Sequence, residues 1–277
     1  MGYRKLQHAS RKVEIKRRKR NCRLLIDSTK LKYKKFIDPR SKTVDGFTEG
    51  FSGELLLGTA PNGNRYIIKH TEVTDAGNEF VASFVARKMG IPVAKAHLLT
   101  PNKKFRCPYA VAIDYLDGLE FVKYSKELTD REKRDILAQF ALAIMLNNSD
   151  IVQLYKSMGR VVQVDFGDSF NMGGLFLEAA LRSGEKEIAQ DILDRCRSSF
   201  AISVDCIDFE IPELSRPLGM EPDEARVIMI DAAKKILNIT IEDMEYLVNE
   251  LMNIYPKGVA MNYVSAIAML QRKMETL

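Results

Sequence analysis

The sequence predicts an α+β fold in which a small antiparallel sheet with one helix precedes a mainly helical lobe. Up to about residue 118, short apolar runs rich in branched residues alternate with Gly, Pro and Asn, and stretches with helical spacing follow. The 277 residues, 46% of them hydrophobic and 29% charged, are typical of a globular chain with a sizeable core. We therefore divide the chain into a basic arm at 1–20, a first lobe at 21–118 and a helical lobe at 119–277.

The first lobe begins with runs that are typical of strands. They lie at 22–28, 52–59 and 65–70, and each is rich in Leu, Ile or Tyr. The segment from Ala60 to Asn64 separates the last two runs and contains an Asn-Gly pair, which supplies the positive φ angles of tight hairpins. The pattern therefore predicts an antiparallel hairpin at this point.

A helix is predicted next, over about 74–90. Thr74 or Asp75 is a suitable N-cap, Gly90 is a suitable C-terminal stop and Pro92 lies beyond it. Between these ends the apolar residues recur at helical spacing: Phe80, Val81, Phe84 and Val85. Two further strand-like runs, at 93–99 and 109–116, complete the first lobe.

The second lobe is predicted to begin with a buried helix at about 128–148. Thr129 and Glu132 have the spacing of a capping box, and an apolar stripe follows. A single strand-like run at 160–167 comes next. Further helices are predicted near 175–200 and at 221–237, 240–254 and 258–276, the second of these with Pro222 in its first turn.

Charge is distributed unevenly along the chain. The net charge is +5, but residues 1–42 alone have a balance of +13 and the remainder has −8. A basic arm of this kind could bind nucleic-acid phosphates or an anionic membrane surface, and such binding would weaken with salt. Two other interpretations stay open, namely a solvated extension and an arm that folds back onto the acidic body.

The cysteines and the hydropathy pattern indicate a cytoplasmic protein. The four cysteines form no C-x-x-C pair and have no histidines nearby, so we expect reduced thiols and neither a disulfide framework nor a zinc site. No stretch approaches the ~20 apolar residues of a transmembrane helix. The N-terminus has no apolar segment behind its positive charges, so a secretory signal is not expected.

Polar residues in the first lobe are suited to holding phosphate. Lys69 closes an apolar strand, and Glu79 lies in the first turns of the following helix, where it could pair with the lysine. Upstream, Gly50 and Gly53 flank Ser52, and glycines let backbone N–H groups approach a phosphate closely. Each feature taken alone is also common in ordinary strands, helices and hairpins.

The sharpest pattern is the apolar strand that ends in Asp165, Phe166 and Gly167. A carboxylate fixed at a strand end, with a glycine that lets the chain turn, is a suitable ligand for Mg²⁺ bound to phosphates. Asp150 lies fifteen residues earlier, just past the long helix, where a second catalytic carboxylate is expected. Taken alone, Asp150 is more often a turn residue at a helix end.

In this order the elements resemble the protein-kinase-like fold, specifically the bacterial HipA-type and CtkA-type serine/threonine kinases, and more distantly type II phosphatidylinositol 4-kinases. The resemblance extends over roughly residues 20–255 and implies two lobes that bind ATP and Mg²⁺ between them. It implies a protein Ser or Thr as the phosphoacceptor, with possible autophosphorylation. The site residues it implies are the phosphate-covering loop Gly50, Phe51, Ser52 and Gly53, the nucleotide lysine Lys69 and its partner Glu79, the adenine-holding linker Ile113, Asp114, Tyr115 and Leu116, the catalytic Asp150, and the metal-binding Asp165.

The chain departs from the family pattern after Asp150. The family has a basic or aromatic polar group soon after this aspartate and a metal-binding Asn five residues after it, but residues 151–155 contain neither His nor Asn. We therefore expect Gln153 to be the second metal ligand, with Asn148 and Asp168 as alternatives. Two other functions compete with an active kinase: a pseudokinase or nucleotide-binding module that transfers nothing, and a nucleic-acid-binding regulator that acts through the basic arm.

Overall fold

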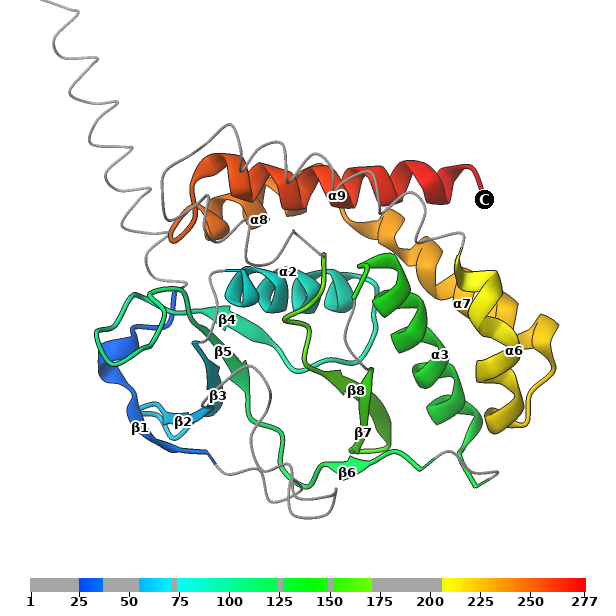
Figure 1. Ribbon diagram of the computed structural model, residues 1–277, viewed down its shortest axis with the longest axis horizontal. Coiled ribbons are helices and arrows are strands. Elements are labelled where there is room, and N and C mark those ends of the chain that lie inside the picture. The colour runs from blue at the N-terminus through cyan, green and yellow to red at the C-terminus, as the bar shows by residue number, and fades with distance from the viewer. Residues whose placement is uncertain (1–24, 37–54, 71–73, 124–126, 149–151, 171–205) are drawn as a thin grey trace, which may run out of the picture.

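The computed structural model describes residues 25–36, 55–70, 74–123, 127–148, 152–170 and 206–277. The basic arm, the predicted strand's residues 22–24, the loop at 50–53, Asp150 and the helices expected near 175–200 lie outside these residues. Figure 1 shows a sheet on one side of the molecule, helices on the other, and helix α2 between them. The α+β fold class is confirmed, with an antiparallel-sheet lobe followed by a mainly helical lobe.

The described part of the first lobe contains a five-stranded antiparallel sheet and one α-helix. The strands lie in the order β1-β2-β3-β5-β4. The bounds are β1 Lys32–Lys35, β2 Leu56–Thr59, β3 Arg65–Lys69, α2 Asp75–Lys88, β4 Ala96–Leu98 and β5 Val111–Asp114, with a 3-10 turn at Ser28–Lys30. The predicted hairpin is confirmed, since β2 pairs with β3 around a turn in which Gly63 has φ 86°.

The second lobe combines a small sheet with helices. Its described elements are β6 Glu120–Phe121, α3 Asp130–Met145, β7 Gln153–Ser157, β8 Arg160–Val164, α6 Ile207–Leu218, α7 Pro222–Lys234, the 3-10 helix η4 Lys235–Asn238, α8 Ile241–Leu251 and α9 Lys257–Glu275. The capping box of α3 forms as predicted, because the Thr129 side chain accepts from the Glu132 N–H and Glu132 accepts from the Thr129 N–H. The predicted helices α7, α8 and α9 are likewise confirmed.

Three predictions of secondary structure were incomplete. The run at 22–28 contributes only an isolated bridge at Ile26 in its described part, and the strand forms later, at β1. Helix α6 was not predicted, because it contains two prolines. The single strand expected at 160–167 is one arm of a hairpin with β7, joined through Met158 and Gly159. Both turn residues have positive φ, at 48° and 70°, which is the type I′ pattern, and Met gives no sequence signal for it.

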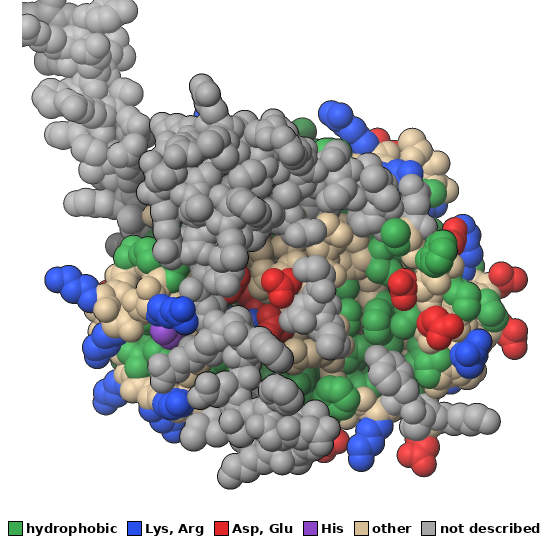
Figure 2. Space-filling view, viewed as in Figure 1, with side chains coloured by type: hydrophobic (Ala, Val, Ile, Leu, Met, Phe, Trp, Pro, Cys, Tyr) green, Lys and Arg blue, Asp and Glu red, His purple; other side chains and the backbone are tan. Residues whose placement is uncertain are grey.

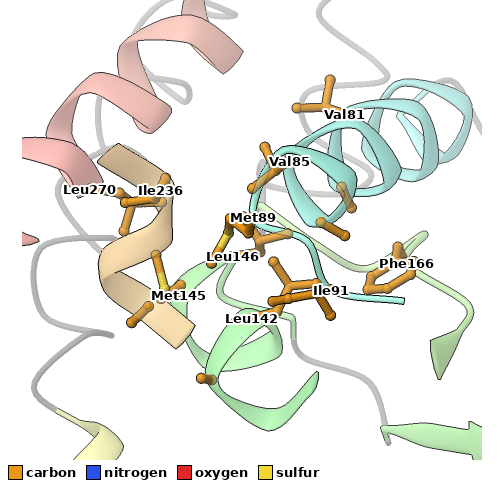
Figure 3. Packing of buried hydrophobic residues seen from close by; sticks show 14 of the residues in the cluster. Val81, Val85, Met89, Ile91, Leu142, Met145, Leu146, Phe166, Ile236 and Leu270 are labelled. Carbon is orange, nitrogen blue, oxygen red and sulfur yellow. The ribbon is translucent and has the colours of Figure 1, made fainter. Parts of the chain in front are cut away.

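The hydrophobic core runs without interruption from α2 to the C-terminal helices. Figure 3 shows Val85 of α2 and Met89, which caps that helix, beside Met145 and Leu146 at the end of α3, with Ile236 and Leu270 on the other side. The described residues of α2 from Ala76 to Ala86 are all buried, although a helix at a molecular surface would expose one face. Helix α2 is thus enclosed by the first-lobe sheet, α3 and the C-terminal helices.

The end of α3 is fixed by a left-handed residue. Asn147 has φ 49°, its N–H donates to the Ile144 carbonyl at 3.0 Å, and the Asn148 N–H donates to the Ala143 carbonyl at 2.9 Å. This pattern is a Schellman motif. The Leu146 carbonyl then accepts from the Phe170 N–H at 2.6 Å, so the end of α3 is tied to the segment that follows β8.

Two findings concern the thiols and the membrane. Cys107 is buried and Cys206 is exposed, and within the described residues neither forms a disulfide. Within the described ranges, no helix combines the length and the hydropathy needed to cross a bilayer.

A first prediction concerns the buried Glu250 of α8, which is 4% exposed. Burial raises the pKa of this carboxyl from the ordinary 4.5 to about 7. The raised pKa means that the folded state holds this proton more tightly than the unfolded chain does. The resulting stabilisation of the folded state is present below pH 4.5. It is lost as the pH rises through 7, by up to about 3 kcal/mol. Glu250→Gln should therefore raise the Tm by several degrees at pH 8 and change it little at pH 4.5.

Thermal unfolding at both pH values tests this, with Glu245→Gln on the exposed side of α8 as the matched control. Equal Tm changes for Glu250→Gln at pH 8 and pH 4.5 would contradict the raised pKa of the Glu250 carboxyl.

Candidate active site

Lys69 reaches the site because it is the last residue of β3. Side chains alternate between the two faces of a strand, and those of Tyr66 and Ile68 enter the core of the first lobe. Ile67 and Lys69 therefore point to the other face, where both line a cavity. The Lys69 side chain is only 11% exposed, so its ammonium needs acceptors within the protein.

Two carboxylates supply these acceptors. Lys69 Nζ donates to Oε1 of Glu79, on α2, and to Oδ1 of Asp165 at 2.5 Å. Glu79 is 2% exposed, and the same Oε1 accepts from the backbone N–H of Phe166 at 3.0 Å. Glu79 therefore joins β3, α2 and the segment after β8 at one point.

Asp165 follows β8 directly and has an unusual backbone conformation. Its φ is 73°, in the left-handed region, whereas Gly167 is not among the residues with positive φ. The chain does turn over 167–170, beginning at the glycine, but the left-handed conformation falls on the aspartate. A non-glycine residue held there costs roughly 1–3 kcal/mol and persists only when its surroundings fix it. The bond from Lys69 to Asp165 and the bond from the Phe166 N–H to Glu79 provide that support.

Burial and the neighbouring charges shift the pKa values of all three groups. Burial alone would lower the pKa of Lys69, but the charges of Glu79 and Asp165 outweigh it and raise that pKa above its usual range. The Lys69 ammonium lowers the pKa of Asp165. Burial raises the pKa of Glu79 against the opposing effect of the ammonium. At neutral pH the site therefore contains a lysine cation beside an ionised Asp165.

The cavity next to these groups has a volume of about 340 Å³, within the roughly 300–1,000 Å³ range of small-molecule sites. Lys69 and Asp165 lie on its wall together with Gln153, the first residue of β7. The rest of the lining is largely apolar and includes Phe36, Leu55, Ile67, Ala94, Leu119 and Val164. Figure 2 shows acidic side chains gathered at the middle of this face, between the sheet of β1–β5 and the helices α3 and α6.

The predicted linker also lines this cavity, through Ile113, Asp114, Tyr115 and Leu116. The N–H of Asp114 donates to the Lys95 carbonyl at 2.8 Å, and that of Tyr115 donates to the Arg65 carbonyl at 2.9 Å. Within the described residues, the N–H of Leu116 has no such backbone partner. This N–H is therefore a candidate donor to a bound ligand.

The structure thus brings Lys69, Glu79, Asp165 and Gln153 together with the linker, whereas the alternative metal ligands Asn148 and Asp168 are not among the residues that line the cavity. Asp150 and the loop residues Gly50, Phe51, Ser52 and Gly53 lie outside the described ranges, so their expected roles stay predictions. The departure after Asp150 has a structural basis. Tyr155, five residues on, is a buried β7 residue whose ring packs edge-to-face on Phe121 at 5.6 Å, and it offers no ligand to the cavity.

Two polar residues beside the site were not predicted. Asp75, interpreted from the sequence as a helix N-cap, has its carboxylate next to Gly167: Cγ would lie 3.6 Å from a Cβ built there. Asn78 donates from Nδ2 to the Gly167 carbonyl at 2.5 Å. The spacing contained one usable signal, because Asp75 and Glu79 are four residues apart and share a helix face.

The donor set fits a metal ion that arrives with phosphates. Asp165 has a side chain 31% exposed on the cavity wall, and the Gln153 amide lines the same cavity. Among the described residues, no group of three or more His, Cys, Asp or Glu side chains is placed to hold a metal. Mg²⁺ commonly takes one or two protein oxygens and completes its octahedron with water and phosphate oxygens. The residues therefore fit Mg²⁺ bound to a phosphorylated ligand better than a self-sufficient metal centre.

Comparisons with known proteins give structural similarities only. No protein-family model matches the sequence, and no curated protein matches it. Among solved structures, the chain is similar to the Helicobacter pylori proinflammatory kinase CtkA, with a TM-score of 0.38 and 14% identity over 75% of this chain and 99% of that one. It is also similar to the Golgi casein kinase, with a TM-score of 0.41 and 11% identity over 82% of this chain and 69% of that one. A structure of the same kinase with Mn and ADP bound gives the same TM-score.

HipA of Shewanella oneidensis, in a complex with HipB and operator DNA, matches with a TM-score of 0.41 and 10% identity, over 82% of this chain and 62% of that one. These solved structures include a CtkA and a HipA, the two types of protein that the sequence resembles. At this identity and these TM-scores the similarity does not extend to function, and the function proposed below rests on the residues of this chain.

A second prediction tests the buried charges. Lys69→Met leaves the Glu79 carboxylate buried without its cation, which should destabilise the fold by about 3–5 kcal/mol. Adding Glu79→Leu should recover much of that loss, because the two residues share one interaction. Urea unfolding of the single and double variants measures both effects.

The matched control is Arg65→Met, at the other end of β3. Arg65 pairs with Asp117, whose side chain is 71% exposed, so its loss should cost no more than about 1 kcal/mol. A Lys69→Met variant as stable as this control would show that the buried contacts contribute little.

Proposed function

We propose that the chain binds ATP with Mg²⁺ in the cavity beside Lys69 and transfers the terminal phosphoryl group to a hydroxyl, with protein Ser or Thr as the acceptor. The observation that carries this proposal is the Lys69 ammonium held between Glu79 and Asp165 at the wall of a mostly apolar cavity. An apolar cavity with a fixed cation and a carboxylate suits a molecule with a flat base and a charged phosphate chain.

The apolar lining suits the adenine ring. Ile67, Ala94 and Ile113 offer aliphatic contacts from three different segments, and the N–H of Leu116 is available as a donor to a ring nitrogen. Hydrogen bonds from a backbone N–H discriminate a purine edge from a purely apolar ring.

The charged groups suit the phosphates. Lys69 stays protonated at neutral pH, and its contact with Glu79 fixes its direction, so it can neutralise phosphate charge without a large rearrangement. Asp165 and Gln153 would hold Mg²⁺, which would screen the charge that develops on the transferred phosphoryl group. The lowered pKa of Asp165 keeps this ligand ionised.

The acceptor side rests on the sequence resemblance. We assign to Asp150 the role of orienting the attacking hydroxyl, which would place the nucleophile in line with the terminal phosphate. The choice of protein Ser or Thr, and autophosphorylation as a side reaction, come from the HipA-type and CtkA-type kinases that the sequence resembles.

A second candidate function is nucleotide binding without transfer. The observation that favours it is the buried position of Tyr155, which leaves Gln153 as the candidate for a second metal ligand. A site with a weakened metal position would retain ATP affinity through the apolar lining and Lys69, while its transfer rate fell.

A third prediction separates the two candidates. At 100 times its Kd, a bound ligand stabilises a protein by about 2.7 kcal/mol, which corresponds to about 5 °C or more in Tm for a chain of this size. We expect ATP to raise the Tm, Mg²⁺ to increase that rise, and radiolabelled phosphate to be transferred to protein. Asp165→Asn should remove the Mg²⁺ increment and lower transfer by at least about 100-fold.

Asp231→Asn, an exposed change on α7, is the matched control and should behave as the unaltered protein. A thermal shift without transfer would favour the nucleotide-binding module. The absence of any shift with ATP, with or without Mg²⁺, would exclude both candidates.

A further inference from the structure

A buried chain of hydrogen bonds connects the last helix to the segment that contains Asp165. The Tyr263 hydroxyl of α9 donates to Asn78 Oδ1 at 2.7 Å, and Asn78 Nδ2 donates to the Gly167 carbonyl at 2.5 Å. Tyr263 is 1% exposed and Asn78 is 4% exposed. Because buried polar groups need their partners, each of these bonds restricts where its neighbour can lie.

A second contact brings α2 close to the same C-terminal region. The backbone N–H of Gly77 donates to the Tyr255 hydroxyl at 2.9 Å. A Cβ at position 77 would lie 2.5 Å from the Tyr263 hydroxyl and 3.2 Å from the Tyr255 ring, so only glycine permits this approach. The C-terminal region is therefore fitted to the backbone of α2.

Aromatic packing holds the two tyrosines in place. The Tyr255 ring stacks on Tyr109 with centroids 4.9 Å apart, and the Tyr263 ring packs edge-to-face on Phe170 at 5.1 Å. Phe170 lies in the segment that follows Asp165. Tyr263 therefore contacts this segment twice, once through Asn78 and once through its own ring.

The position of Asn78 connects these contacts with the candidate site. Asn78 directly precedes Glu79, which binds Lys69, and its partner Gly167 is two residues from Asp165. The hydrogen bond from Asn78 thus joins α2 to the Asp165 segment independently of the bonds that Lys69 makes. Tyr263 orients the Asn78 amide, because its hydroxyl occupies the oxygen and directs the Nδ2 group toward Gly167.

We propose that Tyr263 and Asn78 are positioning residues, through which helix α9 sets the relative placement of Glu79 and Asp165. The expected effect on catalysis rests on the proposed function. The expected effect on the structure rests on the hydrogen bonds alone. Tyr263 touches none of the reacting groups, so its effect passes through Asn78.

The experiment compares Tyr263→Phe, which removes one hydroxyl and keeps the ring, with Tyr246→Phe as the control. Tyr246 is a 43% exposed residue of α8, outside the hydrogen-bond chain. Hydrogen exchange is measured on a peptide spanning 160–170, which contains the Phe166 amide bound to Glu79, and on a reference peptide from α7. We expect Tyr263→Phe to speed exchange in 160–170 by up to about tenfold, the effect of losing one hydrogen bond, without changing α7.

Steady-state kinetics with ATP then tests the catalytic consequence. Tyr263→Phe should lower kcat by about tenfold and leave the KM for ATP within about twofold, because misplaced groups cost rate more than binding. Asn78→Ala should have a similar effect. The double variant should be little worse than Asn78→Ala alone, because the two residues act in series.

Three results would overturn the proposal: exchange in 160–170 equal to that of the Tyr246→Phe control, an equal increase in both peptides, which indicates general destabilisation, or kcat unchanged while exchange rises. If the unaltered chain transfers no phosphate, the proposed function fails, and the exchange measurement still decides whether Tyr263 positions the Asp165 segment.

Discussion

The site depends on one buried ammonium. Lys69 is nearly enclosed, and its cost of burial is offset only because Glu79 and Asp165 come from two other elements to meet it. The requirement acts on the whole architecture: β3 must end at this residue, α2 must present Glu79 to it, and β8 must stop at Asp165. A fold that supplies these acceptors to the lysine also places a cation and a partly exposed carboxylate, that of Asp165, at the wall of a cavity.

Helix α2 transmits this constraint to the rest of the molecule. Its buried residues face the first-lobe sheet, the end of α3 and the C-terminal helices, and all of these share one core. Ser83 of α2 also binds the Ala94 carbonyl and the Ala96 N–H, both at 3.0 Å, which fixes the approach to β4. The two lobes therefore hold α2 jointly, and Glu79 has little freedom relative to either.

Patterning and turn chemistry predicted much of the fold, including α2, the β2–β3 hairpin, the capping box of α3 and the C-terminal helices. Lys69, Glu79 and Asp165 were predictable because strand and helix ends mark where polar groups leave a core. The β7–β8 turn was not predictable, because Met158 adopts a positive φ that only tertiary pairing stabilises. Asp75 and Asn78 were missed for a related reason: their roles depend on Gly167 and Tyr263, about 90 and 185 residues away, and no local pattern encodes such distances.

Three consecutive residues of α2 contact other parts of the chain: Gly77 contacts Tyr255, Asn78 contacts Gly167 and Tyr263, and Glu79 contacts Lys69 and Phe166. Successive side chains on an α-helix are separated by about 100° of rotation, so Asn78 and Glu79 leave the helix in clearly different directions. Turning α2 about its axis would therefore strain the bonds of Asn78 and those of Glu79 together. The rotational position of α2 and its contact with Lys69 are thus fixed by the same few bonds.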